Sequence, residues 1–229
     1  MGMNPTVWKD FKVLGRRKGT LVLALFASSI VSVSSSYGAS HGADHLAKFE
    51  SYISYYSVFL PIIVGYMISS IVFAMDIGER SIEAIFTTPL SPRRILIGKT
   101  FVVAFTSWLL GAVAFAAGIL TFWSLTRDIT GVMKLSVAAN TLIAFPLVFG
   151  IYGLAGVGYW LVPNPTAMTI ITMFLFMASV LLLSVGPFLI PLATAKMTLT
   201  SMAISIIAMA LFLLLVSKIS KERVTLARL

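Results

Sequence analysis

The longest stretch of this chain without charge is the feature that most limits how it can fold. Residues 135 to 195 contain no Asp, Glu, Lys, Arg or His. A single helix of that length would run about 90 Å, whereas the apolar core of a bilayer is about 30 Å thick. The stretch must therefore fold back on itself. Pro163, Asn164 and Pro165 predict where, because proline ends one helix and suits the start of the next.

Other uncharged windows lie at residues 19–40, 51–75, 100–126 and 197–217. A membrane-spanning helix needs about 20 apolar residues. Only 11% of residues are charged, against about a quarter in soluble domains. We therefore predict an all-α integral membrane protein, a single transmembrane domain over residues 1–229 with six spans. The expected spans are 19–40, 51–75, 96–124, 136–162, 166–187 and 197–217.

The distribution of basic residues predicts the orientation of these spans, because cytoplasmic segments of membrane proteins are enriched in Lys and Arg. With the N-terminus inside, thirteen of the 17 basic residues fall in inner segments. The four in outer segments are Lys48, Arg127, Lys134 and Lys196. We expect a multi-pass protein of the cell membrane with both termini cytoplasmic, including the tail 218–229. This bias also accounts for the net charge of +9 without nucleic acid as a partner.

The N-terminal residues 1–18 read as an amphipathic helix lying in the inner membrane interface. One face is apolar, with Trp8 as the expected anchor, and the opposite face is polar. The two faces comprise Val7, Trp8, Phe11 and Leu14, and Lys9, Asp10 and Lys12. An alternative is a signal peptide that includes the first span, which the long basic lead disfavours.

Aromatic residues near the ends of the spans are expected to face the lipid headgroups. They are Tyr52, Tyr55, Tyr56, Phe122, Trp123, Tyr159 and Trp160. Trp108 lies in the middle of a span, where this rule gives no reason for it.

The spans carry no ionisable residue at mid-depth, which disfavours ion-coupled transport and intramembrane catalysis. They contain rows of small residues that suit close helix packing, such as Gly150, Gly153 and Gly156. Hydroxyl groups are the other polar feature. Those of Ser28, Ser29, Ser32 and Ser69 either line a polar substrate path or bond to carbonyls of their own helices.

A short outer loop places His41, Asp44 and His45 close together in sequence. Two His residues four apart can bind a metal on one helix face. Gly42 between them and the lack of a third strong ligand favour a solvated loop, and we expect no metal site.

One dense charged segment, residues 76–94, separates two of the uncharged windows. Its apolar positions share one helical face and its charged positions share the other, which predicts a helix along the inner membrane surface. The two faces are Ile82, Ile85 and Phe86, and Glu79, Arg80 and Glu83. Thr88 and Pro89 end this helix, and Ser91 and Pro92 suit the N-cap and first position of the next.

The placement of Glu79 and Glu83 four residues apart costs stability, because like charges then face each other. A cationic partner surface would give a reason for the pair, but a solvated interfacial helix remains equally open. The motif of Gly98, Lys99 and Thr100 does not form a nucleotide-binding loop, because Arg93 stands where that loop needs glycine. No energy source is therefore apparent on this chain.

The charged segment resembles the first cytoplasmic loop of ABC-2-type ABC transporter permeases. The resemblance is carried by Glu79-Arg80, Ile82-Glu83, Ile85-Phe86, Thr88-Pro89-Leu90-Ser91 and Gly98-Lys99, and it departs from the family pattern at Ser81. The N-terminal segment WKDFKVLGRRKG is also similar to that family's interfacial helix.

This resemblance implies a permease subunit, in most cases of an exporter, that pairs with a second permease copy (a homodimer or paralogue) and with ABC ATPase subunits. ATP and Mg²⁺ would bind the ATPase, and this chain would hold no cofactor and no catalytic residue. Residues 76–91 would form the coupling segment, with partner contacts through Glu79, Arg80, Ile82, Glu83, Phe86, Thr88, Pro89 and Ser91. A membrane scaffold that binds a soluble partner, and less favoured a secondary transporter, are the alternatives.

Overall fold

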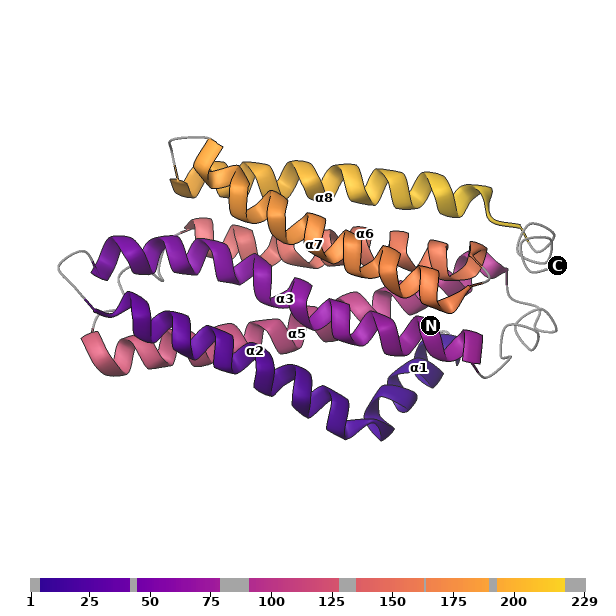
Figure 1. The fold of residues 1–229 in the computed structure, drawn as a ribbon, viewed down its shortest axis with the longest axis horizontal. Helices are drawn as coiled ribbons and strands as arrows, with labels where there is room; N and C mark the ends of the chain where they lie inside the picture. Colours follow the sequence, from indigo (N-terminus) through magenta and orange to yellow (C-terminus); the bar gives the residue numbers. More distant parts are fainter. Residues whose placement is uncertain are drawn as a thin grey trace.

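The computed structural model of the chain describes residues 5–41, 45–78, 91–127, 135–162, 164–189 and 193–220. Within these ranges the chain is entirely helical, with no strand. The helices are α1 (Pro5–Arg16), α2 (Lys18–Ala39), α3 (His45–Gly78), α5 (Pro92–Thr126), α6 (Leu135–Leu161), α7 (Pro165–Leu189) and α8 (Ala193–Lys218). Figure 1 shows the long helices running along an elongated bundle, with α1 at an angle to them.

Each predicted span lies largely within one long helix, because helices whose side chains lack charge can be buried in lipid over their whole length. Five helices of the described ranges are long and apolar enough to cross a membrane. The qualifying segments are Lys18–Ala39, Tyr52–Phe73, Pro92–Thr126, Val137–Leu161 and Thr198–Lys218. In α7 the corresponding apolar segment, Thr166–Ala178, is shorter than these five. The chain is thus an all-helical protein with the helices of a multi-pass membrane protein.

The predicted break in the longest uncharged stretch is confirmed. Helix α6 ends at Leu161, and α7 begins at Pro165. The side-chain Oδ1 of Asn164 accepts hydrogen bonds from the backbone N–H groups of Thr166 at 2.9 Å and Ala167 at 3.3 Å. Asn164 therefore caps α7, since these amides have no partner inside the helix.

Helices α3 and α5 share the centre of the packing. Helix α5 contacts α1, α2, α3, α6 and α8, and α3 contacts α2, α5, α6, α7 and α8. Successive long helices alternate in direction, so that α1, the end of α3, the start of α5 and the end of α8 lie at one end of the bundle (Figure 1). Any displacement of α5 would therefore be felt by most of the bundle.

Small residues allow the helices around α5 to approach closely. A Cβ atom on Gly111 would overlap the Pro61 ring of α3. A Cβ atom on Gly118 would overlap the hydroxyls of Tyr52 on α3 and Ser32 on α2. In α6, Gly153 lies against Phe212 of α8 in the same way. Within the described ranges these small residues serve packing inside one bundle, as close helix contacts in membranes generally require.

The expectation that aromatic residues near the span ends face the headgroups is largely wrong. Tyr52, Phe122, Tyr159 and Trp160 are buried in the core. Phe122 stacks on Phe49, with ring centroids 3.4 Å apart. Trp123 is the exposed exception. An aromatic side chain fills space between helices as readily as it faces a membrane interface, so position along a span does not distinguish the two.

Candidate functional site

Most of the predicted coupling segment lies outside the described residues, including Glu79, Arg80, Ile82, Glu83, Phe86, Thr88 and Pro89. The structure describes its flanks. Helix α3 continues to Gly78, and Ser91 occupies the N-cap position of α5 with Pro92 as the first helical residue. This agrees with the sequence expectation for position, although the Ser91 side chain makes no capping hydrogen bond. In the chain the segment thus follows the end of α3 and precedes the start of α5, which lie at the same end of the bundle (Figure 1).

A buried ion pair joins α1 to α5 a short distance beyond this connection. The Lys99 Nζ donates a hydrogen bond to Asp10 Oδ1 across 3.0 Å. The exposed fractions of the two side chains are only 7% for Lys99 and 9% for Asp10. Charges withdrawn from water to this extent are tolerated when they compensate each other. The pair therefore fixes α1 against the first turns of α5.

The burial of Asp10 corrects the sequence expectation that it belongs to the solvated face of α1. Leu14 is buried in the main core, and the Phe11 ring meets that of Phe105 edge-on at 6.2 Å. Asp10 lies about 40° around the helix from Leu14, since four residues make slightly more than one turn. Asp10 therefore sits at the margin of the face that packs on α5, and only a cation there makes this placement tolerable.

A second polar contact holds the same end of α5 to α8. The Arg93 Nε donates a hydrogen bond to the backbone carbonyl of Ile219 across 3.1 Å. Ile219 directly follows the end of α8 and is itself buried. We call Pro92 to Thr100 the α5 base. It is bound on one side to α1 and on the other to the end of α8.

The motif of Gly98, Lys99 and Thr100 lies inside α5 and forms part of this base. The Thr100 hydroxyl donates to the Leu96 carbonyl of its own helix at 2.9 Å. A phosphate-binding loop would instead present backbone amides at the beginning of a helix. In this chain the Lys99 ammonium serves a contact between helices.

The serines predicted as a possible substrate path form hydrogen bonds with two kinds of partner. Ser28 and Ser69 donate to carbonyls of their own helices, at 2.8 Å to Ala24 and 3.0 Å to Tyr66. Ser32 instead bonds the Tyr52 hydroxyl of α3 at 2.7 Å. Ser29 is half-buried. Ser28 and Ser69 therefore bond the backbone of their own helices, and Ser32 joins α2 to α3.

Three further polar contacts between helices were not predicted from the sequence. The Tyr152 hydroxyl donates to the Ile62 carbonyl of α3 at 2.6 Å. The Trp108 Nε1 donates to the Thr141 carbonyl of α6 at 2.8 Å, which explains this mid-span tryptophan. The Asn140 Nδ2 donates to a carbonyl of α3 at 3.3 Å. The sequence did hold a signal for these contacts, because a polar group isolated in an apolar window needs a hydrogen-bond partner when it is buried.

An apolar groove of about 510 Å³ opens between α6 and α8. Its lining residues are Ile143, Pro146, Met202, Ser205, Ile206, Met209, Ala210 and Leu213. Ser205 contributes the one hydroxyl. A groove of this character suits an apolar chain, whether of a lipid or of another hydrophobic molecule.

The outer histidines show no metal site in the described part of the chain. His41 is exposed, and its Nδ1 lies 2.8 Å from the Tyr37 carbonyl of the preceding helix turn. Asp44 lies outside the described residues, as does the His45 side chain. No group of three or more His, Cys, Asp or Glu side chains that could hold a metal occurs among the residues described.

Comparison with known proteins gives no assignment. No protein-family profile matches the chain, and no curated protein matches it significantly.

Proposed function

We propose that this chain is the membrane permease subunit of an ATP-driven transporter of the ABC-2 kind, powered by a separate ATPase. The observation that carries the proposal is the position of the charged segment. Residues 79–90 follow α3 and precede α5 in the chain, and α5 contacts helices on several sides, from α1 to α8. A partner that moved this segment would move α5.

The contacts at the α5 base favour transmission of such a movement. Lys99 is tied to α1 by its ion pair with Asp10, and Arg93 is tied to the chain just after α8. A segment that joined the bundle through mobile or weakly packed helix ends would dissipate a displacement locally. The α5 base is instead buried along one side, at Ile95, Leu96 and Lys99.

The buried charges favour an energy source on another chain. Among the described residues, Asp10 and Lys99 are the buried charged side chains, and they pair with each other. Ion-coupled transporters generally keep an ionisable group at mid-membrane that binds the coupling ion. Lys99 lies only about 10 Å along α5 from its start, which is close to the expected inner surface.

The proposal includes six membrane crossings with both termini cytoplasmic. Helix α7 has 25 residues, a length of about 37 Å that suffices to cross a bilayer core. Its direction alternates with that of α6 and α8 (Figure 1). In this arrangement the segment 76–91 faces the cytoplasm, where an ATPase with bound ATP and Mg²⁺ would meet it. A second permease copy would complete the transporter.

The groove between α6 and α8 supports a hydrophobic or amphipathic cargo. Its lining is apolar apart from Ser205, and a highly charged molecule would lose hydration there without compensation. Export as the direction of transport rests on the resemblance of the charged segment.

Co-purification tests the proposal. The tagged chain is expected to retain an ATPase that carries Walker A and B motifs, and reconstitution in liposomes should stimulate that ATPase. The substitution Glu79→Lys/Glu83→Lys reverses the charge of the segment and should abolish both effects. The matched variant Glu50→Lys/Asp128→Lys reverses two charges in outer segments and should change neither. If the inner variant retained the ATPase as fully as the native chain, the coupling assignment would be wrong.

A further inference from the structure

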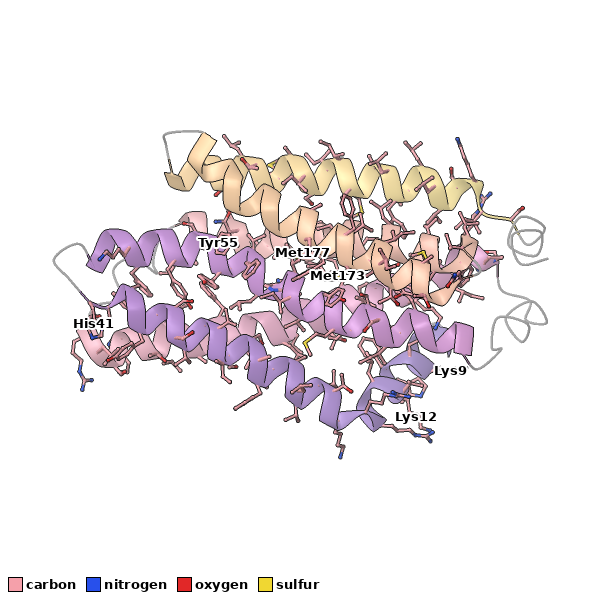
Figure 2. All side chains as sticks on the ribbon, in the orientation of Figure 1. Lys9, Lys12, His41, Tyr55, Met173 and Met177 are labelled. Atoms are coloured by element: carbon pink, nitrogen blue, oxygen red, sulfur yellow. The ribbon has the colours of Figure 1, made fainter. Side chains whose placement is uncertain are left out.

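We infer that the outward face of α1, continued by the first residues after it, is a binding surface for anionic phospholipid headgroups. It is built from Lys9, Lys12 and Arg16 of α1, from Arg17, and from Lys18 at the start of α2. All five side chains are exposed. Figure 2 shows Lys9 and Lys12 on α1, at the end of the bundle where α8 also ends. The inference concerns the chain alone and does not depend on the proposed ATPase.

The charge of this face is unbalanced because of the ion pair described above. Asp10 is the sole acidic residue between residues 5 and 18. It is turned toward α5 and neutralised by Lys99. The outward face of α1 therefore presents cations without a carboxylate of its own helix among them. Clusters of this kind beside a membrane helix attract anionic lipids.

Two apolar side chains of α1 pack against the protein and not against the membrane. Leu14 is buried in the protein core, and Phe11 packs on Phe105. An interfacial helix that inserts apolar side chains into lipid would leave those side chains exposed. Contact between α1 and the membrane must therefore use the remaining face. This favours an electrostatic contact over an apolar one.

Trp8 marks where this face meets the headgroups. Its side chain is 61% exposed, and it adjoins Lys9 in sequence and Lys12 one turn further along the helix. Tryptophan prefers the headgroup region, where its ring is partly apolar and its N–H remains hydrated. A purely water-facing surface would give no reason to expose the largest side chain of α1 beside these cations.

Quenching of Trp8 fluorescence tests the inference. The full chain is reconstituted in phosphatidylcholine vesicles in which a minor fraction of lipid is brominated, either as phosphatidylglycerol or as phosphatidylcholine. The chain has 4 tryptophans, so the signal of Trp8 is obtained by subtracting the signal of Trp8→Phe. Brominated phosphatidylglycerol should quench Trp8 several-fold more than brominated phosphatidylcholine, and added salt should reduce the difference.

Removal of the cations should remove the preference. Each charge lost is expected to lower the association constant for phosphatidylglycerol about fivefold, so Lys12→Gln/Arg16→Gln/Arg17→Gln should quench equally with both lipids. The matched variant Lys48→Gln/Arg127→Gln removes exposed cations at the opposite end and should keep the native preference. Equal quenching of the native chain by both lipids would overturn the inference, because α1 would then meet the bilayer without preferring anionic headgroups. Quenching by neither lipid would overturn it as well, because α1 would then lie away from the bilayer.

Discussion

Lys99 of α5 and Asp10 of α1 form an ion pair of 3.0 Å that is almost fully withdrawn from solvent. The two residues lie far apart in sequence, and neither has a charged neighbour on the packed face of its own helix. The pair fixes the position of the N-terminal helix and, through it, the position of the exposed cationic face of α1.

Loss of one member of this pair should be much more harmful than loss of both. Asp10→Leu or Lys99→Met removes one charge of the buried pair and should lower the free energy of unfolding by about 3–5 kcal/mol. The double variant Asp10→Leu/Lys99→Met should recover most of that loss, because an apolar contact can replace a buried ion pair. Unfolding in mixed micelles measures both. Lys12→Met, at an exposed position on α1, is the control, and equal costs for single and double variants would contradict the pairing.

Gly118 should not tolerate a larger side chain. A Cβ atom there overlaps the hydroxyls of Tyr52 and Ser32, so Gly118→Leu must separate α5 from α2 and α3. Overpacking of this kind costs about 1–3 kcal/mol, and here it also breaks the hydrogen bond between Ser32 and Tyr52. Thermal unfolding in detergent should show the loss. Ala116→Leu, at an exposed position two residues away, should leave the melting temperature nearly unchanged.

Tyr152→Phe should cost a modest amount of stability without altering the packing. Its hydroxyl donates to the Ile62 carbonyl, and its ring lies where a side chain on Gly65 would otherwise be. Since phenylalanine keeps the ring and removes one hydrogen bond, we expect a loss of about 0.5–1.5 kcal/mol. The exposed Tyr37→Phe serves as the control. A loss as large as that of Tyr152→Ala would show that the hydroxyl matters more than the ring.

Labelling of single introduced cysteines should show six membrane crossings. The native chain has no cysteine, so each introduced cysteine is the sole site of labelling. Lys48→Cys should react in intact cells with a maleimide that cannot cross membranes. Lys12→Cys, Thr166→Cys and Lys218→Cys should react only after the membrane is opened. Labelling of Lys218→Cys in intact cells would place the end of α8 outside and require an odd number of crossings.

The positions of the long helices follow from the sequence, because an uncharged window is the direct requirement of a helix in lipid. The turn at Asn164 also follows, since proline limits the backbone and asparagine caps locally. Contacts between helices do not follow in this way. Asp10 was assigned to the polar face together with Lys9 and Lys12, whereas the cation with which it is buried lies on α5. Tyr159 and Trp160 were assigned to the membrane interface because buried and lipid-facing aromatic residues share one sequence pattern.

In the candidate site, too, local features could be predicted from the sequence and contacts between helices could not. The N-cap position of α5 at Ser91 was placed correctly because cap signals are local. Helix α3 instead continues to Gly78, three residues beyond the predicted end of its span at residue 75. The ion pair and the contact of Arg93 with Ile219 depend on how α1 and α8 pack on α5. A lone acid at the margin of an apolar face, as at Asp10, was the signal that could have indicated a buried partner.

The central claim is that the charged segment touches an ATPase, and cross-linking tests it most directly. In the complex that co-purifies with the tagged chain, Glu83→Cys provides a unique attachment point for a short bifunctional cross-linker. The account predicts a covalent product between this residue and the ATPase, and none from Glu50→Cys at the opposite end of the preceding helix. A complex that forms but gives no product from position 83, or equal products from both positions, would contradict the account.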